Sequence, residues 1–390
     1  MVNLADTQRE LTSARLFSLA AAIACTSIMG MSTGLAWALL ALRLEHQGYD
    51  GAAIGLNAAA QSLGIALIGL VAPRIIARAG FKRSCLGATI MTMAMMLALP
   101  TFDNYSAWLV LRFVLGASSS FLFIAGESWI LLIAPARYLG RVVGILGLVW
   151  GGAFALGPII IGLLGIAGWG PFLVGAAAAF SAGLPLLFAG AVPVPAQSLK
   201  PPNFLALLRR SPAPLIALVV LGLVESSHDS LVAIYGLRLG MEVSQAVLLV
   251  TTLLLGLTLI QLPIGWIADH MDRRRVLLIA NISGLCLTLA FGFAATTVLQ
   301  WPILFLLGAS VGSVWALSLA LIGDDFAAEH VAGANSVRAI LYGGAAMAGP
   351  LISGTAMDIW TPHGLIAALT VMWLVYLPIA WQSPPARALP

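Results

Sequence analysis

Long stretches without charged residues dominate the chain. Lys, Arg, Asp and Glu are absent from residues 16–42, 54–73, 84–102, 142–199, 243–268 and 276–323. A helix needs about 20 apolar residues to cross a bilayer, so the two longest stretches must each hold two helices. The pattern therefore predicts an all-α membrane protein.

Division of these stretches predicts twelve transmembrane helices. They are expected at residues 15–42, 52–74, 84–101, 106–133, 141–165, 169–190, 214–238, 244–268, 276–297, 301–323, 334–358 and 363–382. Between the sixth and seventh helices the chain holds five prolines and three basic residues, a composition typical of a linker. We therefore expect an N-terminal six-helix bundle over residues 1–190, a linker over 191–213 and a C-terminal six-helix bundle over 214–390.

The two predicted bundles repeat each other. Gly116-Ala117-Ser118 corresponds to Gly308-Ala309-Ser310, and Trp150-Gly151-Gly152-Ala153 corresponds to Tyr342-Gly343-Gly344-Ala345, each 192 residues further along. Parallel repeats in a transporter place its substrate site at their interface, near the middle of the membrane. The sequence thus predicts two pseudo-symmetric bundles around a central site.

Composition and charge narrow the functional classes. Hydrophobic residues make up 61% of the 390 residues and charged residues 9%, against about 25% charged in soluble domains. The net charge of +4 comes from short basic clusters between the predicted helices and does not indicate nucleic-acid binding. We expect the lipid bilayer as a partner and no nucleic acid. The three cysteines lack metal-site spacing, and we expect no metal, no cofactor and no enzymatic activity.

The distribution of basic residues predicts the orientation in the membrane. Sixteen of the nineteen Lys and Arg residues lie at the termini and in alternate loops, and the loops at the opposite end hold only Arg43 and Arg238. Basic loops face the cytoplasm, so both termini are expected there, in the inner membrane of the cell. The first apolar stretch is too long for a cleaved signal peptide.

The seventh predicted helix carries an ionisable cluster. Glu225, His228 and Asp229 stand at positions i, i+3 and i+4 and so share one helix face. A charge at the bilayer centre costs about 2.5–3.5 kcal/mol on insertion scales, so the cluster should face a wet cavity or a partner charge. We interpret these residues as a proton-coupling site with Glu225 as the proton carrier. The alternative is a structural role, with His228 as a hydrogen-bonded spacer.

The fourth predicted helix carries a second polar face. Arg112 and Glu127 lie on it too far apart to pair, and Arg112 lies at a depth similar to that of Asp229. Arg112 could therefore pair with Asp229 or bind an anionic part of the substrate, and Glu127 is a further proton-coupling candidate. The repeat places Leu304 at the position equivalent to Arg112, so the architecture itself does not require this charge.

Other polar and aromatic residues within the predicted helices complete a candidate substrate site. The additional substrate-binding candidates are Asn57, Gln61, Gln261, Trp37, Trp150, Trp315 and Tyr342. Hydrogen bonding between helices is the alternative role for the amides, and anchoring at the membrane interface is the alternative for the aromatics.

Several motifs resemble a known family. Gly265-Trp266-Ile267-Ala268-Asp269-His270-Met271-Asp272-Arg273-Arg274 resembles the G-x-x-x-D-R-x-G-R-R loop of the major facilitator superfamily. Arg112-Phe113-Val114-Leu115-Gly116 is similar to its R-x-x-x-G motif, and Gly126-Glu127-Ser128-Trp129 extends the likeness to the YcaD-like branch of bacterial carriers. The resemblance implies the major facilitator fold. In the first half, Ala77 replaces the aspartate of the loop motif.

The loop motif also suggests a gate. Asp269 is expected to pair with Arg137 or Arg141, while Arg273 belongs to the same gating loop or simply anchors it at the membrane surface. Taken together, the sequence predicts a monomeric secondary carrier that moves a small organic solute by alternating access, driven by protons. Gly-Pro pairs at 157–158 and 349–350 favour export, since a similar motif accompanies antiporters in the superfamily. The alternatives are an uncoupled anion uniporter that uses Arg112 and a non-transporting receptor or enzyme on a carrier scaffold.

Overall fold

The computed structural model describes residues 13–102, 104–133, 139–188, 212–325 and 328–382, which form helices and short connections without a strand. In the first half the helices are α1 (Ser13–His46), α2 (Gly51–Ala79), α3 (Phe81–Ala98), α4 (Tyr105–Ile133), α5 (Leu139–Leu164) and α6 (Gly170–Phe188). In the second half they are α8 (Pro212–Arg238), α9 (Val243–Leu259), α10 (Gln261–His270), α11 (Arg273–Ala294), α12 (Gln300–Asp325), α13 (Ala328–Ile359) and α14 (Gly364–Gln382).

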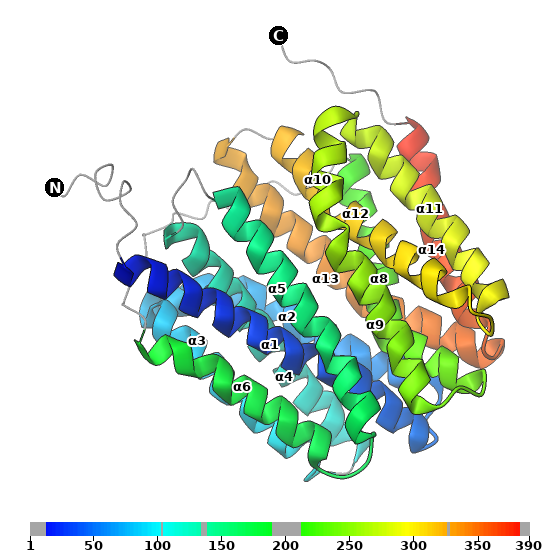
Figure 1. The fold of residues 1–390 in the computed structure, drawn as a ribbon, viewed down its shortest axis with the longest axis horizontal. Helices are drawn as coiled ribbons and strands as arrows, with labels where there is room; N and C mark the ends of the chain where they lie inside the picture. Colours follow the sequence, from blue (N-terminus) through cyan, green and yellow to red (C-terminus); the bar gives the residue numbers. More distant parts are fainter. Residues whose placement is uncertain (1–12, 103, 134–138, 189–211, 326–327, 383–390) are drawn as a thin grey trace.

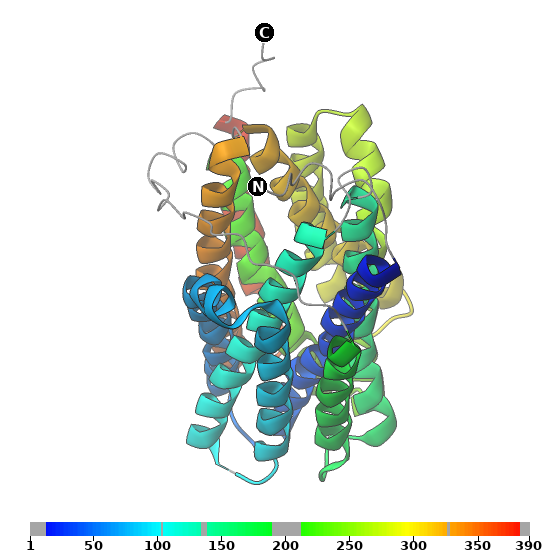
Figure 2. The same cartoon turned by 90° about the vertical axis from the view of Figure 1, so that its left-hand side faces the viewer.

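The helices form two groups that lie side by side, α1–α6 in blue to green and α8–α14 in green to red (Figure 1). Figure 2 views the first group from its outer side. Between the groups, α2 packs along α13, α5 along α9, and α1 against α8. The twelve predicted spans are all present, because α9 and α10 together occupy the eighth. The predicted linker lies outside the described residues, apart from Pro212 and Ala213, which begin α8.

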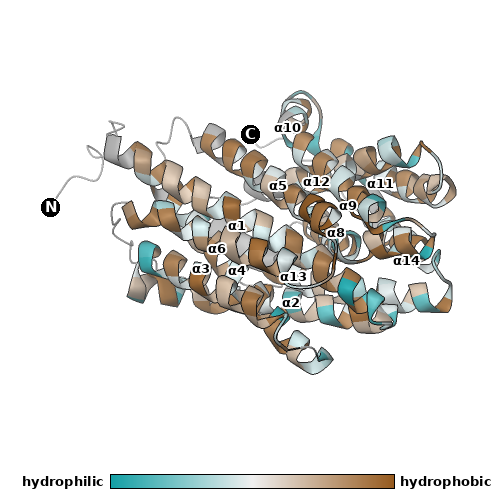
Figure 3. Ribbon diagram, turned by 60° about the horizontal axis from the view of Figure 1, so that its bottom comes forward, coloured by the Kyte–Doolittle hydropathy of each residue, from teal (hydrophilic) through white to brown (hydrophobic). Residues whose placement is uncertain are grey.

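The helices are built for a lipid surrounding. Nine helices of the described ranges are long and apolar enough to cross a membrane, and Val243–Leu259 and Gly364–Pro378 are shorter apolar helices. Hydrophilic residues gather at helix ends and loops in Figure 3, whereas the helix lengths are mostly hydrophobic. Large apolar side chains such as Phe293 (90% exposed) and Leu163 (80%) lie on the outer surface. Such a surface requires lipid rather than water around it.

The eighth predicted helix is broken where the sequence suggests continuity. The α-helical pattern stops after Leu259 and starts again at Gln261. Pro263 explains the break, because it has no N–H to donate to the carbonyl of Leu259 and its ring crowds that carbonyl. The predicted helix over 244–268 is therefore wrong in this detail.

The sequence repeat reappears in the packing of helix on helix. A Cβ on Gly116 would overlap the carbonyl oxygen of Gln61, and a Cβ on Gly308 would overlap that of Leu253, 192 residues further along in both cases. A Cβ on Gly30 would likewise crowd the carbonyl oxygen of Trp150. At the equivalent positions, 192 residues further along, a Cβ on Gly222 would crowd that of Tyr342. Glycine permits these close backbone approaches because it has no side chain. The two groups are thus pseudo-symmetric bundles, which confirms the predicted fold class.

One equivalent pair of loops is built differently in the two halves. Gly80 between α2 and α3 has φ 77°, a conformation that favours glycine. Asp272, 192 residues later, has φ −59° and accepts a hydrogen bond from the backbone N–H of Arg275 at 2.9 Å, so it caps α11. The motif glycine is therefore replaced in the second half by a helix cap.

Candidate functional site

The acidic cluster of α8 faces α13. The hydroxyl of Tyr342 donates a hydrogen bond of 2.9 Å to Oε2 of Glu225, and both side chains are half-buried. Between the same two helices, the hydroxyl of Ser353 of α13 donates a hydrogen bond of 3.0 Å to the hydroxyl of Ser227 of α8. Because polar side chains within a membrane satisfy each other, these bonds stabilise the contact between α8 and α13.

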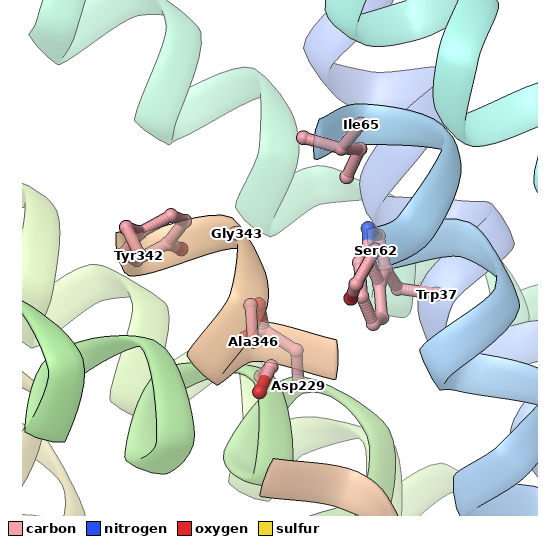
Figure 4. A pocket seen from close by; sticks show the side chains of 8 residues that line it. Trp37, Ser62, Ile65, Asp229, Tyr342, Gly343 and Ala346 are labelled. Atoms are coloured by element: carbon pink, nitrogen blue, oxygen red, sulfur yellow. The ribbon is translucent and has the colours of Figure 1, made fainter. Parts of the chain in front are cut away.

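Asp229 lines a small cavity between the two halves (Figure 4). The cavity has a volume of about 40 Å³, enough for two or three water molecules. Helices α1, α2, α8 and α13 supply its lining, which consists of Trp37, Ser62, Ile65, Ser226, Asp229, Tyr342, Gly343 and Ala346. Oδ1 of Asp229 is buried and has no hydrogen-bond partner among the described residues. The site therefore contains an acceptor that a proton or a ligand could complete.

The cavity lies where equivalent parts of the two halves meet. Trp37 of α1 and Asp229 of α8 are 192 residues apart, and both line it. At the position equivalent to Glu225 the first half has Thr33, whose hydroxyl donates to the carbonyl of Met29 in its own helix at 3.0 Å. The acidic residues are thus confined to one half of a site that both halves build.

Arg112 joins three helices of the first half. Its side chain is fully buried, and it donates through Nε to Oε1 of Gln61 at 2.9 Å and through Nη1 to Oδ1 of Asn57 at 2.6 Å. Its Nη2 donates to the carbonyl of Trp37 at 3.4 Å, and the guanidinium lies 5.4 Å from the centre of the Trp37 ring. A cation over an indole ring is a favourable contact. Arg112 therefore links α4 to α2 and α1.

Arg112 and its two amide partners do not line the cavity in this conformation. All three have no exposed surface, and the described side chains show no ion pair between Arg112 and either Glu225 or Asp229. Trp37 both lines the cavity and contacts Arg112. The expected polar face of α4 exists at Arg112, but it is directed at neighbouring helices of its own half.

His228 is buried beside the cavity without joining it. It is 1% exposed, and neither ring nitrogen has a hydrogen-bond partner in the described part of the chain. A proton relay needs a group within about 2.6–3.2 Å, directly or through one water. No described group lies within direct hydrogen-bond reach of His228 in this conformation.

The remaining predicted residues are spread over the interior. Trp150 packs on Phe154, with ring centres 5.2 Å apart, while Trp315 meets Tyr342 edge-on at 5.5 Å. Gln261 begins α10 and lies beside Gly147 of α5, at the contact between the halves. Glu127 is half-buried on α4 and does not line the cavity.

The predicted gating residues are only partly described. The side chains of Asp269, Arg137 and Arg141 lie outside the described part of the structure. Arg273 donates through Nε to the carbonyl of Ala268 at 3.3 Å, which ties the start of α11 to the end of α10. Across the described ranges, no three His, Cys, Asp or Glu side chains are grouped so that they could hold a metal ion.

A cluster that the sequence analysis did not assign connects the two halves at the end where α1, α8 and α13 finish. We call it the Arg238 cluster; it consists of Arg238, Glu45 and Asp358. Arg238 forms a forked contact with both carboxylate oxygens of Glu45, at 2.8 and 3.0 Å, and reaches Asp358 at 3.2 Å.

The same cluster extends to α2. Asp358 accepts hydrogen bonds of 2.8 Å from the backbone N–H groups of Gly51 and Ala52, at the start of that helix. A carboxylate is favourable there because the first N–H groups of a helix lack partners. The available sequence signal was an arginine at the end of the molecule where basic residues are scarce.

Comparisons with known proteins agree with this architecture. Residues 22–253 and 215–390 match the family model described as Major Facilitator Superfamily. The uncharacterized MFS-type transporter YfkF of Bacillus subtilis is 24% identical over 91% of this chain and 94% of its own length. The uncharacterized MFS-type transporter YcaD of Escherichia fergusonii is 22% identical over 87% of this chain and 88% of its own.

Solved structures share the fold. A mutant form of the nucleoside transporter NupG matches with a TM-score of 0.75 at 15% identity, over 95% of this chain and 97% of that one. A D-xylose-proton symporter matches with a TM-score of 0.74 at 14% identity, over 95% and 98%. The repeated bundles, the cavity between them and the family match lead to one conclusion: this chain belongs to the Major Facilitator Superfamily and is a multi-pass membrane protein of a transporter family.

Proposed function

We propose that the protein moves a small organic solute across the inner membrane by alternating access and couples that movement to protons. The observation that carries the proposal is the buried oxygen of Asp229 at the cavity, for which the described part of the chain provides no hydrogen-bond partner. A carboxylate within the membrane is costly when charged and incompletely bonded, so a proton or a ligand must complete it. The sequence favours Glu225 as the proton carrier, but its carboxylate already accepts a hydrogen bond from Tyr342. We therefore propose Asp229 as the carrier, with Glu225 one turn away, His228 and Glu127 as further candidates.

Alternating access gives roles to the contacts between the halves. With both termini in the cytoplasm, as the basic loops favour, the Arg238 cluster lies at the external end and holds it closed. Transport then requires these contacts to open while a cytoplasmic gate closes. We assign that gate to Asp269 and Arg273 with Arg137 or Arg141. The bundles 1–190 and 214–390 move about the linker 191–213.

Arg112 separates this proposal from its main alternative. An anion uniporter would use Arg112 as its binding group, yet the guanidinium donates to Gln61, Asn57 and the Trp37 carbonyl. An anion would have to replace those bonds. The geometry therefore favours carboxylate-based coupling, with export as the proposed direction.

The test begins with a thermal-shift screen of the purified protein against metabolite libraries at two pH values. The ligand so identified is then followed in proteoliposomes with and without an imposed pH gradient. We expect the gradient to drive accumulation in the native protein and not in Asp229→Asn, which retains the size of the side chain but cannot carry the proton. Asp50→Asn is the matched control, because Asp50 caps α2 at an exposed position and Asn is an equally good cap.

Two outcomes would contradict the proposal. If flux of the solute through the native protein does not depend on the pH gradient, the protein is a uniporter. Gradient-driven accumulation that persists in Asp229→Asn would remove Asp229 from the coupling site.

A further inference from the structure

We propose that the cavity selects an organic cation, an ammonium group carried on a flat or aromatic body, and that this cation and a proton occupy Asp229 in turn. This inference rests on the proposed function, since it names the substrate class of the same site.

The charge of the cavity is the first argument. Asp229 is the one charged side chain among its described lining residues, and Glu225 lies one turn away on the same helix. A bound anion would meet these carboxyl groups at short range and in a low dielectric, where repulsion between like charges is strong. A cation would instead complete Oδ1 of Asp229, which no described residue bonds.

The aromatic lining is the second argument. Trp37 and Tyr342 contribute rings from opposite halves, and Trp315 supports Tyr342 edge-on. Aromatic rings beside a carboxylate form the usual surroundings of a bound ammonium group, through attraction between the cation and the ring. The Trp37 ring already accommodates one cation, the guanidinium of Arg112.

Size and small residues are the third argument. Ser62, Gly343 and Ala346 leave open a cavity of about 40 Å³, which suits an ammonium head group but not a whole ligand. Small-molecule sites commonly enclose about 300–1,000 Å³, so the apolar body of the solute must occupy space that opens when the halves separate. The cavity thus describes the recognition of the head group.

The surroundings of Asp229 make the exchange with a proton specific to it. On α8 the titratable groups within one turn of Asp229 are Glu225, held by Tyr342 of α13, and His228, which does not line the cavity. Tyr235 and Arg238 lie further along α8, and Arg238 pairs there with Glu45 of α1 and Asp358 of α13. Arg112 of α4 lies on Trp37 of α1. The residues of α2 that line the cavity, Ser62 and Ile65, are not titratable. Neither α9 nor residues 300–321 of α12 contain a charged residue, and the titratable side chain of α14 is Tyr376.

The exchange balances in charge. A protonated Asp229 is neutral, and arrival of the ammonium group releases that proton to water, leaving a neutral pair of carboxylate and cation. One proton and one cation therefore exclude each other, and each turnover moves them in opposite directions.

The experiment measures binding by calorimetry with three probes that share a phenylbutyl body: the ammonium form of 4-phenylbutan-1-amine, 4-phenylbutan-1-ol and 4-phenylbutyrate. A primary alkylammonium group loses its proton only near pH ~10, so the probe stays charged at neutral and mildly acidic pH and any pH dependence of its binding there arises from the protein. We expect it to bind at least about tenfold more tightly than the alcohol and the acid. Its affinity should fall by up to about tenfold per pH unit on acidification, as expected for displacement of one proton.

Variants make the test specific. Asp229→Asn should weaken binding of the ammonium probe at least about tenfold and remove its pH dependence, while Asp229→Glu should retain the preference for the cation and Asp50→Asn should leave every value unchanged. Circular dichroism and gel filtration verify that each variant is folded.

Three results would overturn the inference: no binding of the ammonium probe, equal binding of all three probes, or ammonium binding that Asp229→Asn leaves intact. Tighter binding of the acid, together with gradient-driven uptake of another solute, would reject the substrate class and leave proton coupling standing. Cation binding that is independent of pH would support the substrate class but reject the exchange with a proton.

Discussion

Arg112 and Asp229, two ionisable residues within membrane-spanning helices, differ in how their polar atoms are hydrogen-bonded. Arg112 is surrounded by neutral acceptors, from Gln61, Asn57 and the Trp37 carbonyl, whereas Asp229 retains a buried oxygen without a partner among the described residues. Each of the three nitrogens of Arg112 thus has an acceptor, whereas an oxygen of Asp229 remains available to a ligand. We therefore propose a structural role for Arg112 and a binding role for Asp229.

Replacement of Arg112 tests this distinction. Arg112→Lys cannot reproduce a forked donor that reaches two amides, so at least one of Asn57 and Gln61 loses its bond. Hydrogen bonds to charged groups contribute about 1.5–3 kcal/mol each, and we expect a lowered unfolding temperature in detergent. For a ligand from the thermal-shift screen, the affinity of the folded variant should stay within about threefold of the native value.

The control for Arg112→Lys is Arg78→Lys, on the exposed end of α2. A large loss of affinity at unchanged stability would contradict this assignment, because it would make Arg112 a substrate-binding residue.

The sequence identifies part of the site for a simple reason. Glu225, Asp229 and Arg112 are conspicuous because charges are rare in apolar helices, and Trp37 and Tyr342 are aromatics within the same segments. Asn57 and Gln61 are expected from the sequence as substrate contacts, whereas the structure shows them as partners of Arg112. Helical periodicity shows which residues share a face but not which helix that face meets. For the same reason Ser62, Gly343 and Ala346 could not be found.

At the scale of the helix, the contact between α2 and α13 depends on the absence of side chains. A Cβ on Gly55 of α2 would overlap the carbonyl of Pro350, and a Cβ on Gly51 would overlap that of Gly354. A helix-interior glycine costs about 1 kcal/mol relative to alanine, so a specific need for close approach must offset this cost. The two helices therefore meet backbone to backbone where the halves join.

Substitution of Gly55 by alanine should disturb this contact. Gly55→Ala should push α2 away from α13 and favour a state that is open at the end that carries the Arg238 cluster. Spin labels at the exposed positions His46 and Ser244, one in each half, report the separation of that end by pulsed electron spin resonance. The control Gly69→Ala lies on the same helix, at a position where a Cβ meets no described atom within 4 Å.

Gly69→Ala gains the same helix propensity without a clash, so it should leave the label distance unchanged. Identical distances in the two alanine variants would contradict a role for Gly55 in closure.

Helix ends and breaks show where sequence reasoning stops. The twelve spans followed directly from uncharged stretches, but α2 continues past Arg74 and Arg78 to Ala79, because long basic side chains extend from a helix end to water. The break before α10 depends on Pro263, whose effect in a membrane helix varies with the neighbours that satisfy the freed carbonyl.

At the scale of the whole molecule, the Arg238 cluster connects both halves in a single network. Arg238 comes from α8, Glu45 from α1 and Asp358 from α13, and Asp358 also caps α2. The side chains are 14–27% exposed, so the ion pairs contribute modestly and weaken with salt. A closure of modest strength is what a transporter needs if the same contact must open in every cycle.

Glu45→Gln should weaken that closure. It removes the charge opposite Arg238 and retains the size of the side chain, so the state that is open at this end should become more populated, with longer distances between labels at His46 and Ser244. In the native protein, added salt should produce a shift in the same direction. The control Glu242→Gln alters an exposed carboxylate at the same end of the molecule. Unchanged distances in Glu45→Gln, or equal changes in both variants, would contradict the role of the Arg238 cluster.

The equivalence of Trp37 and Asp229 has a consequence for how such a carrier diversifies. The two halves supply equivalent backbone positions at the cavity, yet only the second half has an acid there. Ionic chemistry can therefore change by substitution within residues 214–390 while the other half preserves the scaffold. The double substitution Trp37→Asp with Asp229→Trp tests whether an acid supplied by the first half can replace the one supplied by the second half.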